Sequence, residues 1–150
     1  MPISTSVVLC TYNGARFIEA QWNSLLAQSH LPDEIVVRDD GSRDGTLALL
    51  NSLHRRAEGD GVRVRLARNP RNLGYAANFE AALRDASGDV LFLCDQDDIW
   101  HPDKLAALVA QFEKRPGLLL SCSNARRIDT AGTSLHRSLF DVLKVSRSEL

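Results

Sequence analysis

Three carboxylates stand together near the middle of the chain, directly after a short apolar run. The run is Val90–Cys94, and Asp95, Asp97 and Asp98 follow it. Carboxylates at this spacing repel one another, so either a shared cation or protonation of one of them relieves the repulsion. A site of oxygen ligands suits a hard ion such as Mg²⁺ or Mn²⁺. We therefore predict that a metal ion binds among these three carboxylates, with an acidic turn that only caps the next helix as the alternative.

Two further polar clusters also follow apolar runs. Thr11, Tyr12 and Asn13 come after the first run of the chain, and Asp39 and Asp40 come after the second. Tyr12 offers a ring on which a base can stack, and Asp40 can accept a hydrogen bond from a base N–H. In the alternative interpretation Tyr12 is an ordinary surface aromatic, and the two acids only build a turn and cap a helix.

The spacing of apolar residues along the chain predicts the strands and helices that position these clusters. Short apolar runs predict strands, over Ser6–Cys10, Glu34–Arg38, Val62–Leu66, Val90–Cys94 and Leu118–Cys122. Apolar residues at helical spacing lie between them, around Trp22, Leu50, Phe79 and Leu108, and the stripe at Phe79 includes Tyr75. Strands that alternate with helices predict an α/β fold, with a mostly parallel sheet and helices on both faces.

Two of the strands and the cysteines carry more specific expectations. The continuous apolar run Val90–Cys94 predicts a strand that is buried on both faces. Alternation of apolar residues with arginines over Val62–Leu66 predicts a half-exposed edge strand. Cys10, Cys94 and Cys122 each close an apolar run, which predicts buried, reduced thiols.

In an open parallel sheet, ligands bind beyond the carboxyl ends of the strands, where all three polar clusters must lie. Together they predict a nucleotide-diphosphate site without a P-loop. Its candidate nucleotide-binding residues are Thr11, Tyr12, Asn13, Asp40, Arg71, Asp95 and Gln96. Arg71 lies in the loop before the third helix, where it either meets a phosphate or remains a solvated side chain.

Composition and the absence of certain motifs argue against several classes of protein. The 150-residue chain has a formal net charge of −1, which predicts no nucleic-acid partner. The sequence has no membrane-length apolar run and no signal-peptide pattern, so we expect a cytoplasmic protein. It also lacks a Walker A motif and a Gly-x-Gly-x-x-Gly after the first strand. A phosphatase of the haloacid dehalogenase type would carry its Asp-x-Asp on the first strand, and a receiver domain would need a Lys where Ser123 and Asn124 stand.

Four motifs in this order resemble an inverting glycosyltransferase of family 2 with the GT-A (Rossmann-like) fold. They are Ser6–Gly14, Ile35–Ser42 with Asp44–Thr46, Asn72–Gly74 with Asn78, and Asp95–Trp100 with Pro102–Leu105. The residues of these motifs are most similar to those of rhamnosyltransferase-like members that build surface polysaccharides. The resemblance extends roughly from Ser6 to Ala125. It implies a nucleotide-sugar-binding domain over residues 1–125 and the incomplete start of an acceptor-side region over 126–150.

The resemblance also implies roles for particular residues. Tyr12 would stack on the base, Asp40 would bind the edge of the base, and Asp95 would lie near the ribose. Asp97 would bind Mg²⁺ or Mn²⁺, with Asp98 close by. The family often has Arg where Ala77 stands, so one phosphate contact is expected to be missing.

The same resemblance implies transfer, with inversion, from a dTDP- or UDP-linked sugar to a glycan or lipid-linked acceptor. Its general base lies well beyond the Asp-x-Asp, so we expect the catalytic base beyond Leu150. Regions beyond the chain are expected to bring any association with the inner membrane surface. The alternative is a non-catalytic nucleotide-sugar-binding module or an inactive truncated fragment.

Overall fold

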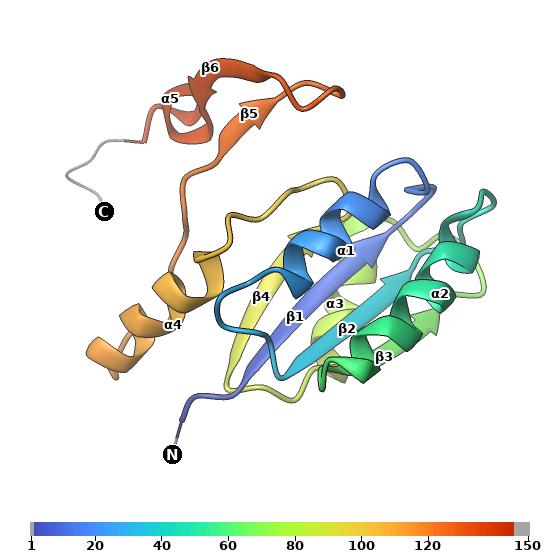
Figure 1. The fold of residues 1–150 in the computed structure, drawn as a ribbon, viewed down its shortest axis with the longest axis horizontal. Coiled ribbons are helices and arrows are strands. Elements are labelled where there is room, and N and C mark those ends of the chain that lie inside the picture. The colour runs from blue at the N-terminus through green and yellow to red at the C-terminus, as the bar shows by residue number, and fades with distance from the viewer. Residues whose placement is uncertain (1, 146–150) are drawn as a thin grey trace. The chain divides into compact units, whose positions relative to one another are not determined.

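The computed structural model describes residues 2–145. The chain forms two compact units, Met1–Lys114 and Arg115–Leu150. The first unit contains a parallel sheet in the order β3-β2-β1-β4 (Figure 1), formed by β1 (Thr5–Thr11), β2 (Glu34–Asp39), β3 (Arg63–Arg68) and β4 (Val90–Asp95). The predicted α/β fold with a parallel sheet is confirmed.

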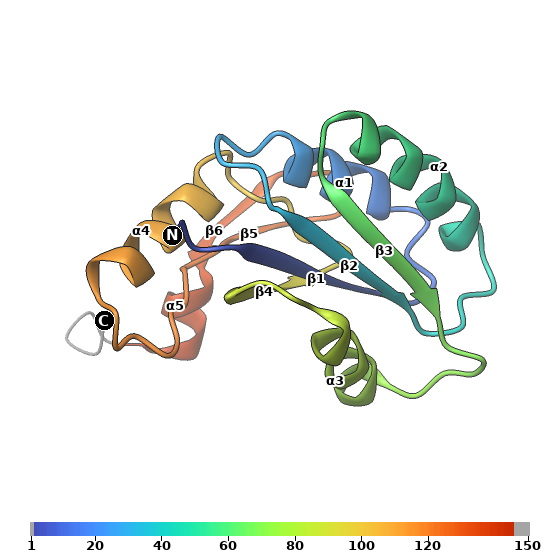
Figure 2. The ribbon, with the colours of Figure 1, turned by 90° about the horizontal axis from the view of Figure 1, so that it is seen from below.

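Helices cover both faces of this sheet (Figure 2). The helices α1 (Ile18–Leu26), α2 (Thr46–Gly59) and α4 (Lys104–Lys114) contribute to the core on one face. The helix α3 (Tyr75–Asp85) lies on the other face, where Phe79 and Ala82 pack against Val8 and Val36. The predicted helices on both faces are therefore confirmed.

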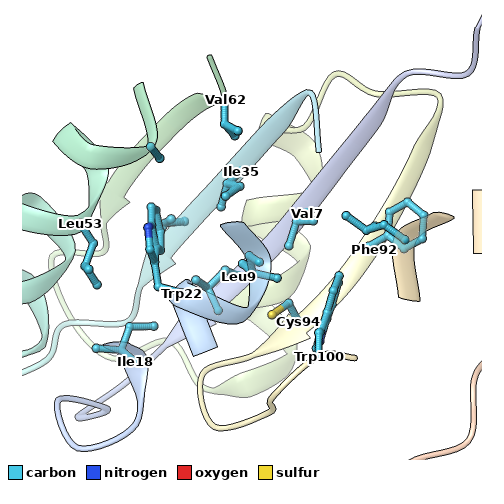
Figure 3. Close-up of a cluster of buried hydrophobic side chains, with 14 of the residues drawn as sticks. Val7, Leu9, Ile18, Trp22, Ile35, Leu53, Val62, Phe92, Cys94 and Trp100 are labelled. Atoms are coloured by element: carbon cyan, nitrogen blue, oxygen red, sulfur yellow. The ribbon is translucent and has the colours of Figure 1, made fainter. Parts of the chain in front are cut away.

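The larger core follows from the alternation of side chains along the strands. Val7 and Leu9 of β1 point to the face that carries Trp22, which is fully buried (Figure 3). Phe92 and Trp100 extend this core with a T-shaped ring contact. Burial of each such side chain stabilises the fold by about 1.5–3 kcal/mol. This packing makes the sheet a rigid support for the loops at its ends.

The register of the sheet gathers polar residues at both ends of the strands. At the amino ends, Ser6 of β1 lies beside Glu34 of β2. At the carboxyl ends, Thr11 lies beside Asp39, and Cys10 lies beside Asp95 of β4. The carboxyl ends of the strands therefore bring the predicted polar clusters to one edge.

Three expectations about exposure in the first unit have different outcomes. The strand β3 is a half-exposed edge strand, as predicted. The prediction that β4 is buried on both faces is wrong, because β4 is also an edge strand and Leu91 and Leu93 are 39% and 59% exposed. Tyr75, expected in a buried stripe, is 70% exposed because it begins α3 at the rim of the sheet.

The second unit contains a small antiparallel hairpin, β5 (Arg126–Ile128) and β6 (Ser134–Ser138), followed by α5 (Leu139–Leu143). The strand predicted over Leu118–Cys122 is wrong. No strand within residues 2–145 pairs with this run, so its backbone lacks the ladder that defines a strand. Its Leu119 is 95% exposed, and Cys122 is exposed rather than buried, whereas Cys10 and Cys94 are buried as predicted.

None of the helices within residues 2–145 combines the length and the apolar character that crossing a bilayer requires.

Candidate functional site

A cavity of about 380 Å³ lies at the carboxyl ends of the strands in the first unit. It is lined by Cys10, Thr11, Tyr12, Asp40, Asn72, Gly74, Tyr75, Asn78, Asp95, Gln96 and Asp97. The structure thus brings six of the predicted site residues together, namely Thr11, Tyr12, Asp40, Asp95, Gln96 and Asp97. The other three, Asn13, Arg71 and Asp98, are outside this lining.

Tyr12 and Gln96 connect the ends of β1 and β4. Gln96 accepts a hydrogen bond from the Tyr12 N–H at 2.8 Å and donates one to the Tyr12 carbonyl at 3.1 Å. Gly14 leaves space for this amide, since a Cβ there would lie 2.1 Å from the Gln96 Oε1. The Tyr12 side chain remains 46% exposed. The Gln96 amide therefore fixes the backbone from which the Tyr12 ring projects.

Asp40 anchors the opposite side of the cavity. Its Oδ1 accepts hydrogen bonds from the Asn69 side chain at 2.7 Å and the Leu73 N–H at 2.8 Å, and its Oδ2 accepts one from the Gly74 N–H at 2.9 Å. Gly74 has a φ of 87°, a conformation that favours glycine. A carboxylate has about four acceptor positions, so one on Asp40 is left for a ligand. Asp40 thus shapes the start of α3 as well as facing the cavity.

Two of the acidic residues at and after the end of β4 have raised pKa values. Partial burial, followed by the charges of Asp98 and Asp97, raises the pKa of Asp95. Burial also raises the pKa of Asp98, where the nearby Lys104 opposes the shift and Asp97 adds to it. Crowded carboxylates of this kind fit the donor preference of a hard cation. Among residues 2–145, however, no three His, Cys, Asp or Glu side chains are already arranged around one metal position.

The predicted residues outside the cavity have structural contacts. Asn13 adopts a φ of 47°, donates its N–H to the Ser42 hydroxyl at 2.9 Å, and accepts the Arg43 N–H at 2.9 Å. It therefore joins the loop after β1 to the loop after β2. Asp39 is buried and accepts a hydrogen bond from the buried Thr11 hydroxyl at 3.0 Å. Arg71 is exposed, and its backbone lies against Gly41.

Five residues of the cavity were absent from the predicted set of ligands: Cys10, Asn72, Gly74, Tyr75 and Asn78. Asn72, Gly74 and Asn78 belong to the sequence motif that lies before and within α3. Their place in this motif is the signal from which they could have been predicted to line the site. Burial, and then the charges of Asp95 and Asp40, raises the pKa of Cys10 to about 12. A raised pKa disfavours the thiolate, which is the nucleophilic form of a cysteine.

The two described acids of the hairpin unit hold its turns. Asp129 accepts hydrogen bonds from the Ala131 and Thr133 N–H groups, each at 2.9 Å. Asp141 accepts from the Ser138 N–H and hydroxyl and completes a capping box at α5. A polar cavity of about 430 Å³ lies within this unit, with Arg126 and His136 in its lining. The catalytic base expected beyond Leu150 lies outside the described residues.

Comparison with known proteins agrees with the observed fold. The chain is 36% identical over 108 residues to an uncharacterized glycosyltransferase of Nostoc, covering 72% of this chain and 32% of that relative. It is similar to S. aureus TarS, solved with UDP and with UDP-GlcNAc, at a TM-score of 0.67 and 26% identity, over 76% of this chain and 33% and 32% of TarS.

A third similar protein is a mannosyltransferase from Pyrobaculum calidifontis, solved with GDP-Man and Mn²⁺. Its TM-score is 0.68 at 24% identity, over 86% of this chain and 36% of that one, so this likeness concerns the fold. The sheet and its helices are those of GT-A glycosyltransferases. The chain spans about a third of the length of these proteins.

The family model for glycosyl transferase family 2 matches residues 6–148. These residues include the sheet, the cavity at its carboxyl edge and the hairpin. The chain therefore belongs to glycosyl transferase family 2.

Proposed function

We propose that this chain binds the donor of a sugar transfer, a nucleotide-diphosphate sugar, in the cavity between Tyr12 and the start of α3. The observation that carries the proposal is the convergence of Tyr12, Asp40, Asp95 and Asp97 on one cavity at the carboxyl ends of the strands. An exposed ring, an acceptor and paired carboxylates are the groups that a base, a ribose and a diphosphate with its cation require.

The base would stack on Tyr12, and the free acceptor position of Asp40 would receive a base N–H. Uracil and thymine each present an N–H between two carbonyl groups, which matches a single acceptor. The solved complexes of the similar TarS contain UDP and UDP-GlcNAc. These observations support a UDP- or dTDP-linked donor.

Asp97, with Asp98 close by, would hold Mg²⁺ or Mn²⁺, which stabilises the charge of a departing diphosphate. Asp95 would lie beside the ribose. Support for the metal comes from the crowding of the three carboxylates: after burial, the charges of Asp98 and Asp97 raise the pKa of Asp95. The Mn²⁺ complex of the mannosyltransferase agrees with this role, although that likeness concerns the fold.

In the complete protein we propose an inverting, metal-dependent transfer in which an acceptor hydroxyl attacks the anomeric carbon. A rhamnosyltransferase-like role in polysaccharide biosynthesis, with a glycan or lipid-linked acceptor, fits the motifs. We propose that this activity takes place in the cytoplasm, with any association with the inner face of the membrane brought by regions outside this chain. Asp129 and Asp141 already hold turns, which supports a catalytic base outside the described residues.

Calorimetric titration of the chain with UDP, dTDP and GDP, with and without Mn²⁺, tests donor binding. We expect UDP or dTDP to bind more tightly than GDP, and only when Mn²⁺ is present. A labelled-donor assay with glycan and lipid-linked acceptors then tests transfer. Absence of binding to all three nucleotides would refute the proposal.

A further inference from the structure

A buried amide, Asn69, lies behind the cavity and contacts three other polar side chains. It is 1% exposed. Its Nδ2 donates to the Asp40 Oδ1 at 2.7 Å and to the Asn78 Oδ1 at 2.8 Å, while its Oδ1 accepts from the Arg38 Nε at 2.9 Å. Both N–H bonds of the amide are therefore used. Asn69 does not itself line the cavity.

The surroundings permit only one orientation of this amide. If the amide were reversed, its oxygen would face two oxygens, and its NH₂ group would face the Arg38 guanidinium. The neighbours are fixed in turn, since Asn78 donates to the Arg38 carbonyl at 3.1 Å and Arg38 forms an ion pair with Asp85 at 2.7 Å. Asn69 therefore presents a donor to Asp40 from a rigid frame of strand and helix.

The position of Asp40 in turn determines one wall of the cavity. Its two oxygens accept the Leu73 and Gly74 N–H groups, directly before α3 begins at Tyr75. Gly74 is the N-cap of α3, and no side chain caps the helix there. The carboxylate of Asp40 thus anchors the turn that leads into α3, and Asn69 holds that carboxylate in place.

We infer that Asn69 is a positioning residue for nucleotide recognition, acting through Asp40 and the Leu73–Gly74 turn. The role in nucleotide recognition rests on the proposed function. Without the amide, Asp40 loses a charge-assisted hydrogen bond, and the Asn78 oxygen and the Arg38 Nε each lose a buried partner. Asp40 then turns toward other donors, and the Leu73–Gly74 turn loses its anchor.

A double-mutant cycle with UDP and Mn²⁺ tests this coupling. Asn69→Ala is expected to weaken UDP binding about tenfold, which corresponds to one buried hydrogen bond to a charged group. In an Asp40→Asn background the same change is expected to weaken binding less than about twofold, because Asn69 acts through that carboxylate. Asn69→Asp, although isosteric, is expected to bind UDP more weakly than Asn69→Ala, since two carboxylates would then face each other.

Ser6→Ala is the matched control at the opposite end of the sheet. It removes a buried hydroxyl that donates to Glu34 at 2.6 Å and accepts the Gly88 N–H at 2.9 Å. It is expected to lower stability to a similar degree and to leave UDP affinity unchanged. Equal losses of affinity from Asn69→Ala in both backgrounds, or a similar loss from Ser6→Ala, would overturn the inference.

Hydrogen exchange tests the same coupling without any nucleotide. Asn69→Ala is expected to remove protection at the Leu73 and Gly74 amides while the amides of β1 remain protected. Unchanged protection of these two amides would overturn the inference even if UDP binds. Failure of the parent chain to bind any nucleotide, with the protection lost as expected, would refute the proposed function and the recognition role of Asn69, and leave only its control of the turn.

Discussion

Buried carboxylates lie at both ends of β2, and two of them, Glu34 at the amino end and Asp40 just after the carboxyl end, are satisfied in different ways. At the amino end, Glu34 accepts from the Ser6 hydroxyl at 2.6 Å and the Ser87 N–H at 3.0 Å, and forms an ion pair with Arg65 at 3.0 Å. At the carboxyl end, Asp40 accepts from one side-chain amide and two backbone N–H groups. Within residues 2–145, no cation forms an ion pair with Asp40.

Under the proposed function, this difference explains how one strand can serve both structure and nucleotide binding. Arg63 and Arg65 form ion pairs with Glu34, and Glu34 lines neither of the two cavities described above. The amino end therefore joins β1, β2 and the turn before β4. Neutral donors hold Asp40 in place and leave its negative charge and one acceptor position toward the cavity. We therefore expect substitutions at the carboxyl end to change binding and substitutions at the amino end to change stability.

The largest expected effect is on metal-dependent binding. Asp97→Ala should abolish Mn²⁺-dependent nucleotide binding without unfolding the chain, because the exposed Asp97 supplies charge to the cavity and little packing. Stability should rise or stay level, since removal of one crowded carboxylate reduces repulsion. Calorimetry with Mn²⁺ and UDP measures the affinity. Asp89→Ala, at the other end of β4, is the control, and equal affinity of the Asp97 variant and the parent would contradict the prediction.

Loss of the exposed ring should be the next largest effect. Tyr12→Ala should weaken binding of every nucleotide, by about 1–3 kcal/mol if stacking here resembles that on single-stranded nucleic acids. Tyr12→Phe keeps the ring and should bind nearly as well as the parent. Titration with UDP, dTDP and GDP distinguishes the outcomes, and equal weakening by Phe and Ala would exclude stacking as the cause.

Asp40→Asn should alter which base binds, as well as how tightly. The new NH₂ group would face at least one of the N–H donors from which Asp40 now accepts a hydrogen bond. It would also put a donor where Asp40 offers an acceptor to the base. The ratio of UDP to GDP affinity should therefore fall toward one. A uniform loss across UDP, dTDP and GDP would show that Asp40 does not read the base.

The amino end should respond to pH through stability alone. Burial by itself raises the pKa of Glu34, but hydrogen bonds from Ser6 and Ser87 and the charge of Arg65 together bring this pKa below its ordinary value of 4.5. The folded state then binds fewer protons than the unfolded state. Its stabilisation is fully present above pH 4.5 and is lost as the pH falls through the lowered pKa.

Glu34→Gln should be destabilising at neutral pH by roughly 1–3 kcal/mol, because buried donors lose their charged acceptor. It should also flatten the loss of stability below pH 4.5. Urea unfolding between about pH 7 and about pH 3 measures both effects. UDP affinity at neutral pH should not change, and a tenfold loss would remove the distinction between the two ends.

Much of the first unit is predictable from local pattern. Apolar runs that end in polar residues predict the four parallel strands, and stripes around Trp22 and Phe79 predict the helices between them. The rim that joins Tyr12, Asp40 and Asp95 follows from the direction of parallel strands. These features depend on periodicity and on chain order, both of which a sequence contains.

The remaining features depend on contacts between distant residues. The exposure of Leu93 follows from the place of β4 at the edge of the sheet, which an apolar run does not reveal. Leu118–Cys122 has the composition of a strand but no partner strand within residues 2–145. The contact between Asn69 and Asp40 joins residues that are 29 positions apart, and it exists only because β3 lies beside β2 in the sheet.

Chemical-shift mapping by NMR tests the central claim most directly, because it locates the ligand on the chain. On addition of UDP and Mg²⁺, the amides of Tyr12, Gly74, Asn78 and Asp97 should shift, whereas those of Ser6, Glu34 and Ser87 should not. This result would place the nucleotide at the carboxyl end of the sheet. Shifts confined to the amino end, or to the hairpin around Arg126 and His136, would contradict the account.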